Sequence, residues 1–145
     1  MEIDVKNTAI KMFNETWDLI DLPERNDEQK ALMLQKAYAS RYLWGLVGEP
    51  VNFARGEWQI SRVHAINKMA EPALLHATLS LDIALNHNLG ALDLAFGYEA
   101  VARAKALMGK TQEAAEYKQK GLEAAAALEG GDKDYTISEL NSIAI

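Results

Sequence analysis

Apolar side chains recur along this chain at intervals of three and four residues, which is the spacing of one face of an α-helix. In the first such segment the pattern is carried by Ile10, Phe13, Trp17 and Ile20. No segment shows the period-2 alternation of a half-buried strand, so the chain is predicted to be all-α. The pattern predicts seven helices, over residues 4–20, 27–46, 50–68, 72–87, 91–108, 111–128 and 134–144.

Helix start and stop signals agree with these boundaries. Asn26 is followed three residues later by Gln29, which is the spacing of a capping box. Pro50 fits the first turn of the third helix, where its missing N–H is not needed. The glycine-containing stretch Glu129–Lys133 reads as a flexible link, after which Asp134 is expected to cap the last helix.

Part of the sequence repeats. When the stretch 54–87 is shifted by 41 residues onto 95–128, seven positions are identical: Ala54/Ala95, Gly56/Gly97, Arg62/Arg103, Ala65/Ala106, Ala73/Ala114, Leu81/Leu122 and Ala84/Ala125. The same shift places Trp17 on Trp58. A fixed period of this size is typical of stacked helix pairs. We therefore expect one domain, residues 1–145, with units at 4–46, 50–87 and 91–128 and a cap at 134–144.

Small residues stand where the two helices of a unit must approach closely, namely Ser61 and Ala73 in one unit and Ala102 and Ala114 in the next. The turn Gly109–Ala114 leads into the second helix of its unit. These features resemble the tetratricopeptide repeat (TPR), although the period of 41 exceeds that family's usual ~34 residues. The resemblance implies a right-handed superhelix of about three antiparallel helix pairs plus a C-terminal capping helix.

Proteins of the TPR family usually bind a segment of another protein in a concave groove lined by the first helix of each pair. On this sequence, the family's groove-facing positions are Arg55, Trp58, Arg62, Phe96, Glu99 and Arg103, with Asn14, Trp17 and Asp21 in the first unit. Residues at i, i+3 and i+7 share a helix face, so helix geometry groups the same residues. The resemblance implies a protein-interaction module, an adaptor or regulatory protein.

Charge along the first helices points to the kind of partner. Glu99 lies four residues before Arg103 and can neutralise it within the helix. Arg62 has no acid at that spacing, because Trp58 stands there. We therefore expect Arg62 and Arg55 to hold carboxylates of an acidic peptide, while Trp58 covers an apolar side chain.

Two alternatives remain open at this point. In one, Trp58 belongs to the core and the arginines pair with acids of this chain such as Glu57, Asp82 or Glu99. In the other, the same arginines and aromatic rings form a pocket for a small molecule or metabolite, and the chain is a sensor.

Composition excludes several classes of function. The net charge of −6 argues against general nucleic-acid binding, which needs a basic surface. There are no cysteines, and the chain has neither a signal-peptide layout nor an apolar run of about 18 residues. We therefore expect a cytoplasmic protein that does not enter a membrane. The apolar ends of a short solenoid also suggest a homodimer.

The sequence contains no motif for catalysis or for a cofactor. Carboxylates are dispersed, the serines lack a nucleophile elbow, and there is no phosphate-binding or dinucleotide-binding loop. His64 and His76 could meet across a helix pair, but a zinc site needs three or four ligands and the sequence indicates no third one. We expect neither an enzyme nor a bound metal or cofactor.

Overall fold

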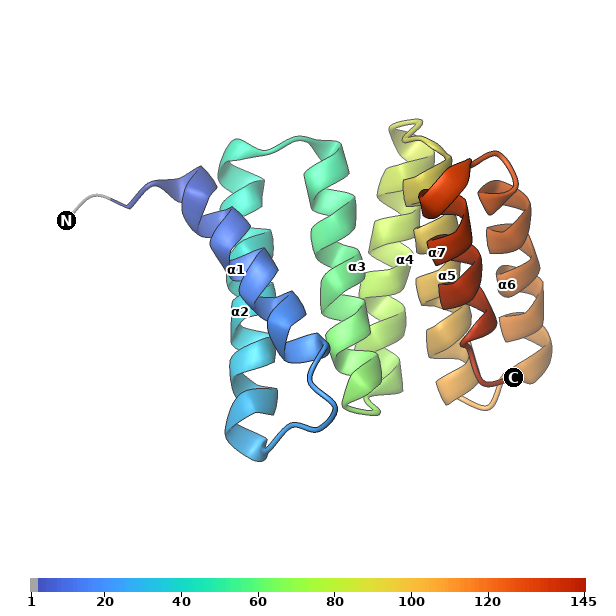
Figure 1. Ribbon diagram of the computed structural model, residues 1–145, viewed down its shortest axis with the longest axis horizontal. Coiled ribbons are helices and arrows are strands. Elements are labelled where there is room, and N and C mark those ends of the chain that lie inside the picture. The colour runs from blue at the N-terminus through green and yellow to red at the C-terminus, as the bar shows by residue number, and fades with distance from the viewer. Residues whose placement is uncertain (1–2) are drawn as a thin grey trace.

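The computed structural model describes residues 3–145, and these form seven α-helices joined by short turns, with no strand (Figure 1). Each segment predicted from the apolar pattern is a helix, so the all-α class is confirmed. The helices are α1 (Val5–Ile20), α2 (Asp27–Val47), α3 (Pro50–Ile66), α4 (Ala70–Asn86), α5 (Ala91–Leu107), α6 (Thr111–Ala125) and α7 (Gly130–Asn141).

Consecutive helices pack in contact, and small side chains allow the close approach within each pair. Ala73 on α4 and Ala114 on α6 are fully buried, as predicted. The hydroxyl of Ser61 on α3 donates to the carbonyl oxygen of Ala73 over 2.7 Å, and Ser80 on α4 donates in the same way to Ala54 on α3 over 2.8 Å. These bonds satisfy the buried hydroxyls and hold α3 against α4 along two successive levels.

Two helix starts differ from the prediction. α4 begins at Ala70 rather than at Pro72. The first four N–H groups of a helix have no partner within it, so Pro72 is tolerated inside the first turn. α7 begins at Gly130, directly after the extended residue Glu129, so Asp134 is not its cap. Gly130 has a φ of 60°, which glycine adopts without a steric penalty, so the chain can turn directly into the helix there.

The C-terminal helix docks on the last pair through the residues expected of a cap. Leu140 is fully buried, and Ile143 and Ile137 join the same apolar cluster with residues of α5 and α6. Gly121 on α6 faces Leu140, and a Cβ atom there would lie only 2.7 Å from a Leu140 methyl group. α7 therefore packs against α6 at Gly121, where the missing side chain leaves room for Leu140.

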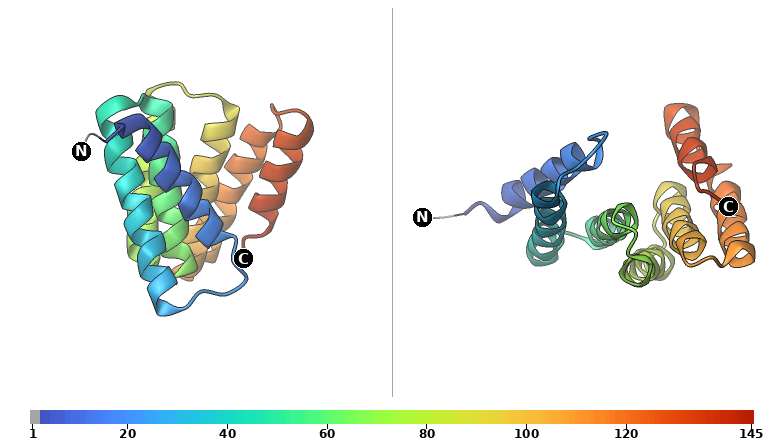
Figure 2. Two further views of the ribbon diagram at one scale, coloured as in Figure 1. Left: turned by 60° about the vertical axis from the view of Figure 1, so that its left-hand side comes forward. Right: turned by 90° about the horizontal axis from the view of Figure 1, so that it is seen from below.

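The two outermost helices shape the molecule. α1 and α7 stand on the same side of the row formed by the other helices, with α3 and α5 between them (Figure 2). On this side, residues of α1, α3, α5 and α7 line a common hollow, with α3 and α5 as its floor and α1 and α7 as its walls. We call this face the groove.

Candidate binding groove

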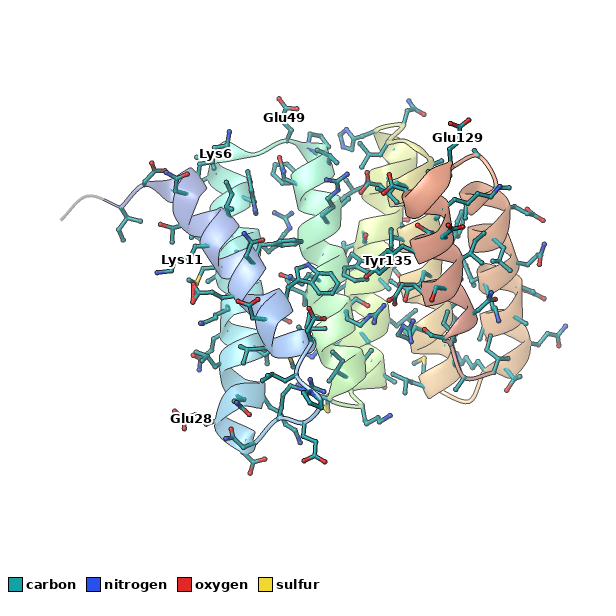
Figure 3. The ribbon with its side chains drawn as sticks, viewed as in Figure 1. Lys6, Lys11, Glu28, Glu49, Glu129 and Tyr135 are labelled. Carbon is teal, nitrogen blue, oxygen red and sulfur yellow. The ribbon has the colours of Figure 1, made fainter. Side chains whose placement is uncertain are left out.

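The middle of the groove contains a cavity of about 190 Å³ that is lined mainly by aromatic side chains. All four helices of the groove contribute to it, together with one residue of α4. Tyr135 reaches into it from α7 (Figure 3). The lining residues are Phe13, Trp17, Ala54, Arg55, Trp58, Ser80, Leu92, Asp93, Phe96 and Tyr135.

The aromatic rings of this cavity pack against one another across the helices. The Trp17 and Trp58 rings stack with centroids 5.5 Å apart, and Phe96 meets Trp58 edge-on at 5.4 Å. Tyr135 lies 6.1 Å from Phe96. Such ring pairs contribute beyond their buried area and fix the ring positions. These ring contacts therefore hold the wall of the cavity in place without a bound ligand.

A second cavity, of about 170 Å³, adjoins the first toward the start of α3. Phe13 and Arg55 line both cavities, and the smaller one is completed by Ile10, Trp44 and Asn52. The Arg55 guanidinium pairs with both oxygens of Asp93, at 2.9 and 3.2 Å. Half of the Arg55 side chain, 51%, is still exposed, so its guanidinium can also donate to an anionic group of a ligand at the rim.

Next to the aromatic cavity, in contact with its Trp58 ring, lies a buried carboxylate, Glu99, whose side chain is 1% exposed. Trp58 Nε1 donates to one of its oxygens over 2.9 Å, while Arg62 and Arg103 donate to the other over 3.0 and 2.9 Å. These three donors offset the cost of burying the charge. Trp58 and Glu99 are 41 residues apart, so this bond places one pair of positions related by the 41-residue shift side by side.

α7 supplies a second carboxylate to this cluster. Arg62 Nη2 donates to the Glu139 carboxylate over 2.6 Å, and Arg103 donates to the Glu139 main-chain carbonyl over 3.1 Å. Burial alone would lower the pKa of Arg62, but the charges of Glu99 and Glu139 outweigh it and raise that pKa. We call Glu99, Arg62, Arg103 and Glu139 the ion-pair cluster.

The expectation that Arg62 is left to bind a partner's carboxylate is wrong. Arg62 is paired twice within the chain, to Glu99 and Glu139. That expectation rested only on acids of the same helix, whereas both acids come from other helices. Glu99 was named in the alternative of internal pairing, and Glu139 was not. The pairing of Arg103 with Glu99 at i, i+4 is confirmed at 2.8 Å. For Trp58, Arg62 and Arg103, the structure matches the alternative in which the tryptophan is buried and the arginines pair internally.

The six residues predicted for the groove thus fall into two groups. Three of them, Arg55, Trp58 and Phe96, line the aromatic cavity. The other three, Arg62, Glu99 and Arg103, belong to the ion-pair cluster. The two groups do not form a single pocket, because Arg62 and Arg103 border a separate hollow of about 490 Å³ near the ends of α3 and α5.

Several residues of the site were not predicted from the sequence, and two of them lie on α7. Tyr135 and Glu139 on α7 close the groove, but α7 lies outside the 41-residue repeat and has no equivalent within it. One signal was present: the two residues are four apart and so share a helix face. The sequence could show that α7 covers the last helix pair, but not that it also reaches across to α3.

A second polar cluster lies away from the groove, between α2, α3 and α4. His64 and His76 meet across their helix pair with ring centroids 5.8 Å apart. The Tyr38 hydroxyl lies 2.9 Å from His64 Nε2 and 3.1 Å from His76 Nε2. His76 Nδ1 lies 2.7 Å from Glu57, whose other oxygen accepts from Arg41 at 3.0 Å. Sequence spacing suggested that the histidines could meet, but gave no sign of the tyrosine between them.

Electrostatics in this second cluster follow from burial and from the neighbouring charges. Burial, and then the proximity of His76, lowers the pKa of His64. Burial alone would raise the pKa of Glu57, but the hydrogen bond and charge of His76, together with Arg41, outweigh it and lower that pKa. Glu57 is therefore held as a carboxylate beside His76.

Comparisons of this chain with protein-family models, with curated proteins and with solved structures found no match. Among residues 3–145, no helix combines the length and the apolar character needed to cross a bilayer. The same residues contain no group of three or more histidine, aspartate or glutamate side chains that could hold a metal ion.

Proposed function

We propose that this chain is a protein-interaction module of TPR-like type that binds a segment of another protein in the groove. The observation that carries the proposal is the aromatic cavity on the concave face, with an exposed arginine, Arg55, at its rim. Aromatic side chains and arginine are enriched at the centres of protein interfaces. A partner would place one large apolar side chain in the cavity that Trp17, Trp58 and Phe96 line.

The size of the cavities favours a peptide over a metabolite. Pockets for small-molecule ligands typically enclose about 300–1,000 Å³, whereas the aromatic cavity holds about 190 Å³. That volume suits a single side chain. The adjoining cavity of about 170 Å³ can take a second one, and Arg55 stands between the two. The partner segment is therefore expected to carry two apolar side chains and an acidic group near Arg55.

A sensor of a small molecule remains the second candidate, but its binding site would be a different hollow from the aromatic cavity. The hollow of about 490 Å³ is within the range of ligand pockets and is bordered by Arg62, Lys68 and Arg103. Because Arg62 and Arg103 already bind carboxylates of this chain, an anionic ligand there would compete with Glu99 and Glu139. That competition makes the hollow the weaker candidate.

The proposal is tested by selecting a displayed library of random peptides on the wild-type chain and on two variants. Leu92→Trp places a large ring at the aromatic cavity. Leu79→Trp makes the same change on α4, at a partly exposed position that does not line the groove. We expect peptides rich in large apolar and acidic side chains on the wild type and on Leu79→Trp, and their loss on Leu92→Trp.

The proposal fails if all three proteins enrich the same peptides, or if none of them enriches any. Circular dichroism of both variants checks that the helices are intact. A peptide set that ignores Leu92→Trp would place the binding surface outside the groove.

A further inference from the structure

The cluster around Tyr38 joins three helices through one oxygen atom. Tyr38 Oη on α2 is within 3.1 Å of the Nε2 atoms of both His64 on α3 and His76 on α4. A phenol has one proton to donate, so it can donate to only one of the two imidazoles. The other imidazole must donate to the phenol oxygen or face it with a lone pair.

The carboxylate of Glu57 determines which of the two imidazoles accepts the hydrogen bond from the Tyr38 hydroxyl. Glu57 Oε2 lies 2.7 Å from His76 Nδ1 and, as a carboxylate, can only accept. A neutral His76 therefore carries its proton on Nδ1 and presents an Nε2 lone pair to Tyr38. The phenol donates to that lone pair, and His64 donates from Nε2 to the phenol oxygen. Arg41, at 3.0 Å from the other Glu57 oxygen, fixes the carboxylate in place.

This pattern is also the one that proteins build around a bound metal. A metal-ligating histidine almost always donates its other ring N–H to a carboxylate or carbonyl, which fixes the tautomer and the ring orientation. The pair Glu57 and His76 has this arrangement. Tyr38 Oη lies within 3.1 Å of the Nε2 atoms of both His64 and His76, so three possible ligand atoms lie close together.

We propose that Tyr38, His64 and His76 form a binding site for a divalent transition-metal ion of the zinc class, with Glu57 orienting His76. The ion would displace the phenol proton into solvent and bind the phenolate. His64 would move its proton from Nε2 to Nδ1, and His76 would keep its own on Nδ1. One proton is released for each ion bound, and a fourth position stays open to water, as in zinc sites with three protein ligands.

The distances fit a tetrahedral ion after small movements. With Zn–N of about 2.0–2.1 Å, ligand atoms on a tetrahedral zinc ion lie about 3.3 Å apart. The two Oη–Nε2 separations, 2.9 and 3.1 Å, need to widen only slightly. The imidazole planes differ by 17° with centroids 5.8 Å apart, against about 5 Å for two imidazoles on one such ion. Tyr38 is partly exposed, so the ion can enter from solvent.

The test is calorimetric titration of the full chain, free of any histidine tag, with Zn²⁺ in two buffers that differ in protonation enthalpy. We expect one ion per chain and close to one proton released. Co²⁺, used as a spectroscopic substitute, should give the intense visible bands of a tetrahedral complex. Loss of a residue that orients a ligand typically weakens metal binding by about 10–100-fold, and Glu57→Gln should fall in this range.

Variants of the three ligands and of the remaining histidine separate this site from adventitious binding. His64→Ala and His76→Ala should weaken binding more than Glu57→Gln does, and Tyr38→Phe should weaken it and abolish proton release. His87→Ala is the matched control, because His87 lies at the exposed end of α4. If a histidine variant fails to fold, Tyr38→Phe still tests the site, because it keeps the packed aromatic ring and removes only the hydroxyl.

The inference is overturned if the wild type shows no saturable one-to-one binding. It is equally overturned if Tyr38→Phe and the foldable histidine variants bind Zn²⁺ as tightly as the wild type, or if His87→Ala alone abolishes binding.

Discussion

At the scale of single residues, Glu99 is the buried carboxylate on which three side chains of the groove converge. Its buried carboxylate accepts from Trp58 and Arg62 on α3 and from Arg103 on its own helix. Removing one partner of a buried ion pair leaves the others uncompensated and typically costs about 3–5 kcal/mol. Because Arg62 and Arg103 keep some exposure, 15% and 19%, the lower end of that range applies.

We therefore predict that Glu99→Gln lowers the free energy of unfolding by about 3 kcal/mol, measured by urea denaturation. Glu139→Gln is the control, because Glu139 is more exposed and leaves Arg62 and Arg103 still bound to Glu99. It should cost clearly less. Equal costs for the two variants would contradict the central position of Glu99.

Ala114 tests the helix crossing at the same scale. It is fully buried where α6 packs, so Ala114→Leu should overpack the site and cost about 1–3 kcal/mol. The neighbouring Ala115 is exposed on the same helix, and Ala115→Leu should be nearly neutral. Thermal unfolding of both variants gives the comparison; an unchanged midpoint for Ala114→Leu would count against the helix register.

At the scale of elements, α7 is more than a cover for the last pair. Leu140 and Ile143 anchor it on α5 and α6, Tyr135 contributes to the aromatic cavity, and Glu139 reaches Arg62 on α3. The capping position was predictable from the apolar residues of the segment. The contact with α3 was not, since it depends on how far the units rotate relative to one another.

We predict that Leu140→Ala costs about 2–5 kcal/mol, the usual range for a buried leucine, and exposes apolar surface that binds a hydrophobic dye. Leu75→Ala, at a 58% exposed leucine of α4, is the matched control and should change little. Deleting residues 130–145 should have the stronger effect and promote aggregation. A truncated chain as stable as the full one would show that α7 contributes nothing to the core.

At the scale of the whole molecule, much of the architecture followed from periodicity alone. The helical spacing located all seven helices, and the 41-residue shift placed Trp58 beside Glu99 and Arg62 beside Arg103. Which arginine stays accessible could not be derived in this way, because acids from other helices decide it. The sequence indicated that His64 and His76 could meet, but the position of Tyr38 between them depends on packing between three helices and could not be predicted.

Exposed apolar side chains also lie outside the groove, among them Leu75 and Leu79 on α4, with Met108 nearby. Such patches promote association. We expect light scattering at tens of micromolar to give the mass of a dimer, and Leu75→Glu combined with Leu79→Glu to give that of a monomer. A monomer mass for the wild-type chain would remove the expectation.

The most direct test of the central claim, that the groove binds a partner segment, is the affinity of one selected peptide for three proteins. Calorimetry with the wild type, Leu92→Trp and Leu79→Trp compares a filled aromatic cavity with the same substitution outside it. Filling the cavity should remove about 1.4 kcal/mol or more, a tenfold loss of affinity, while Leu79→Trp should match the wild type. Equal affinity for Leu92→Trp and the wild type would contradict binding in the groove.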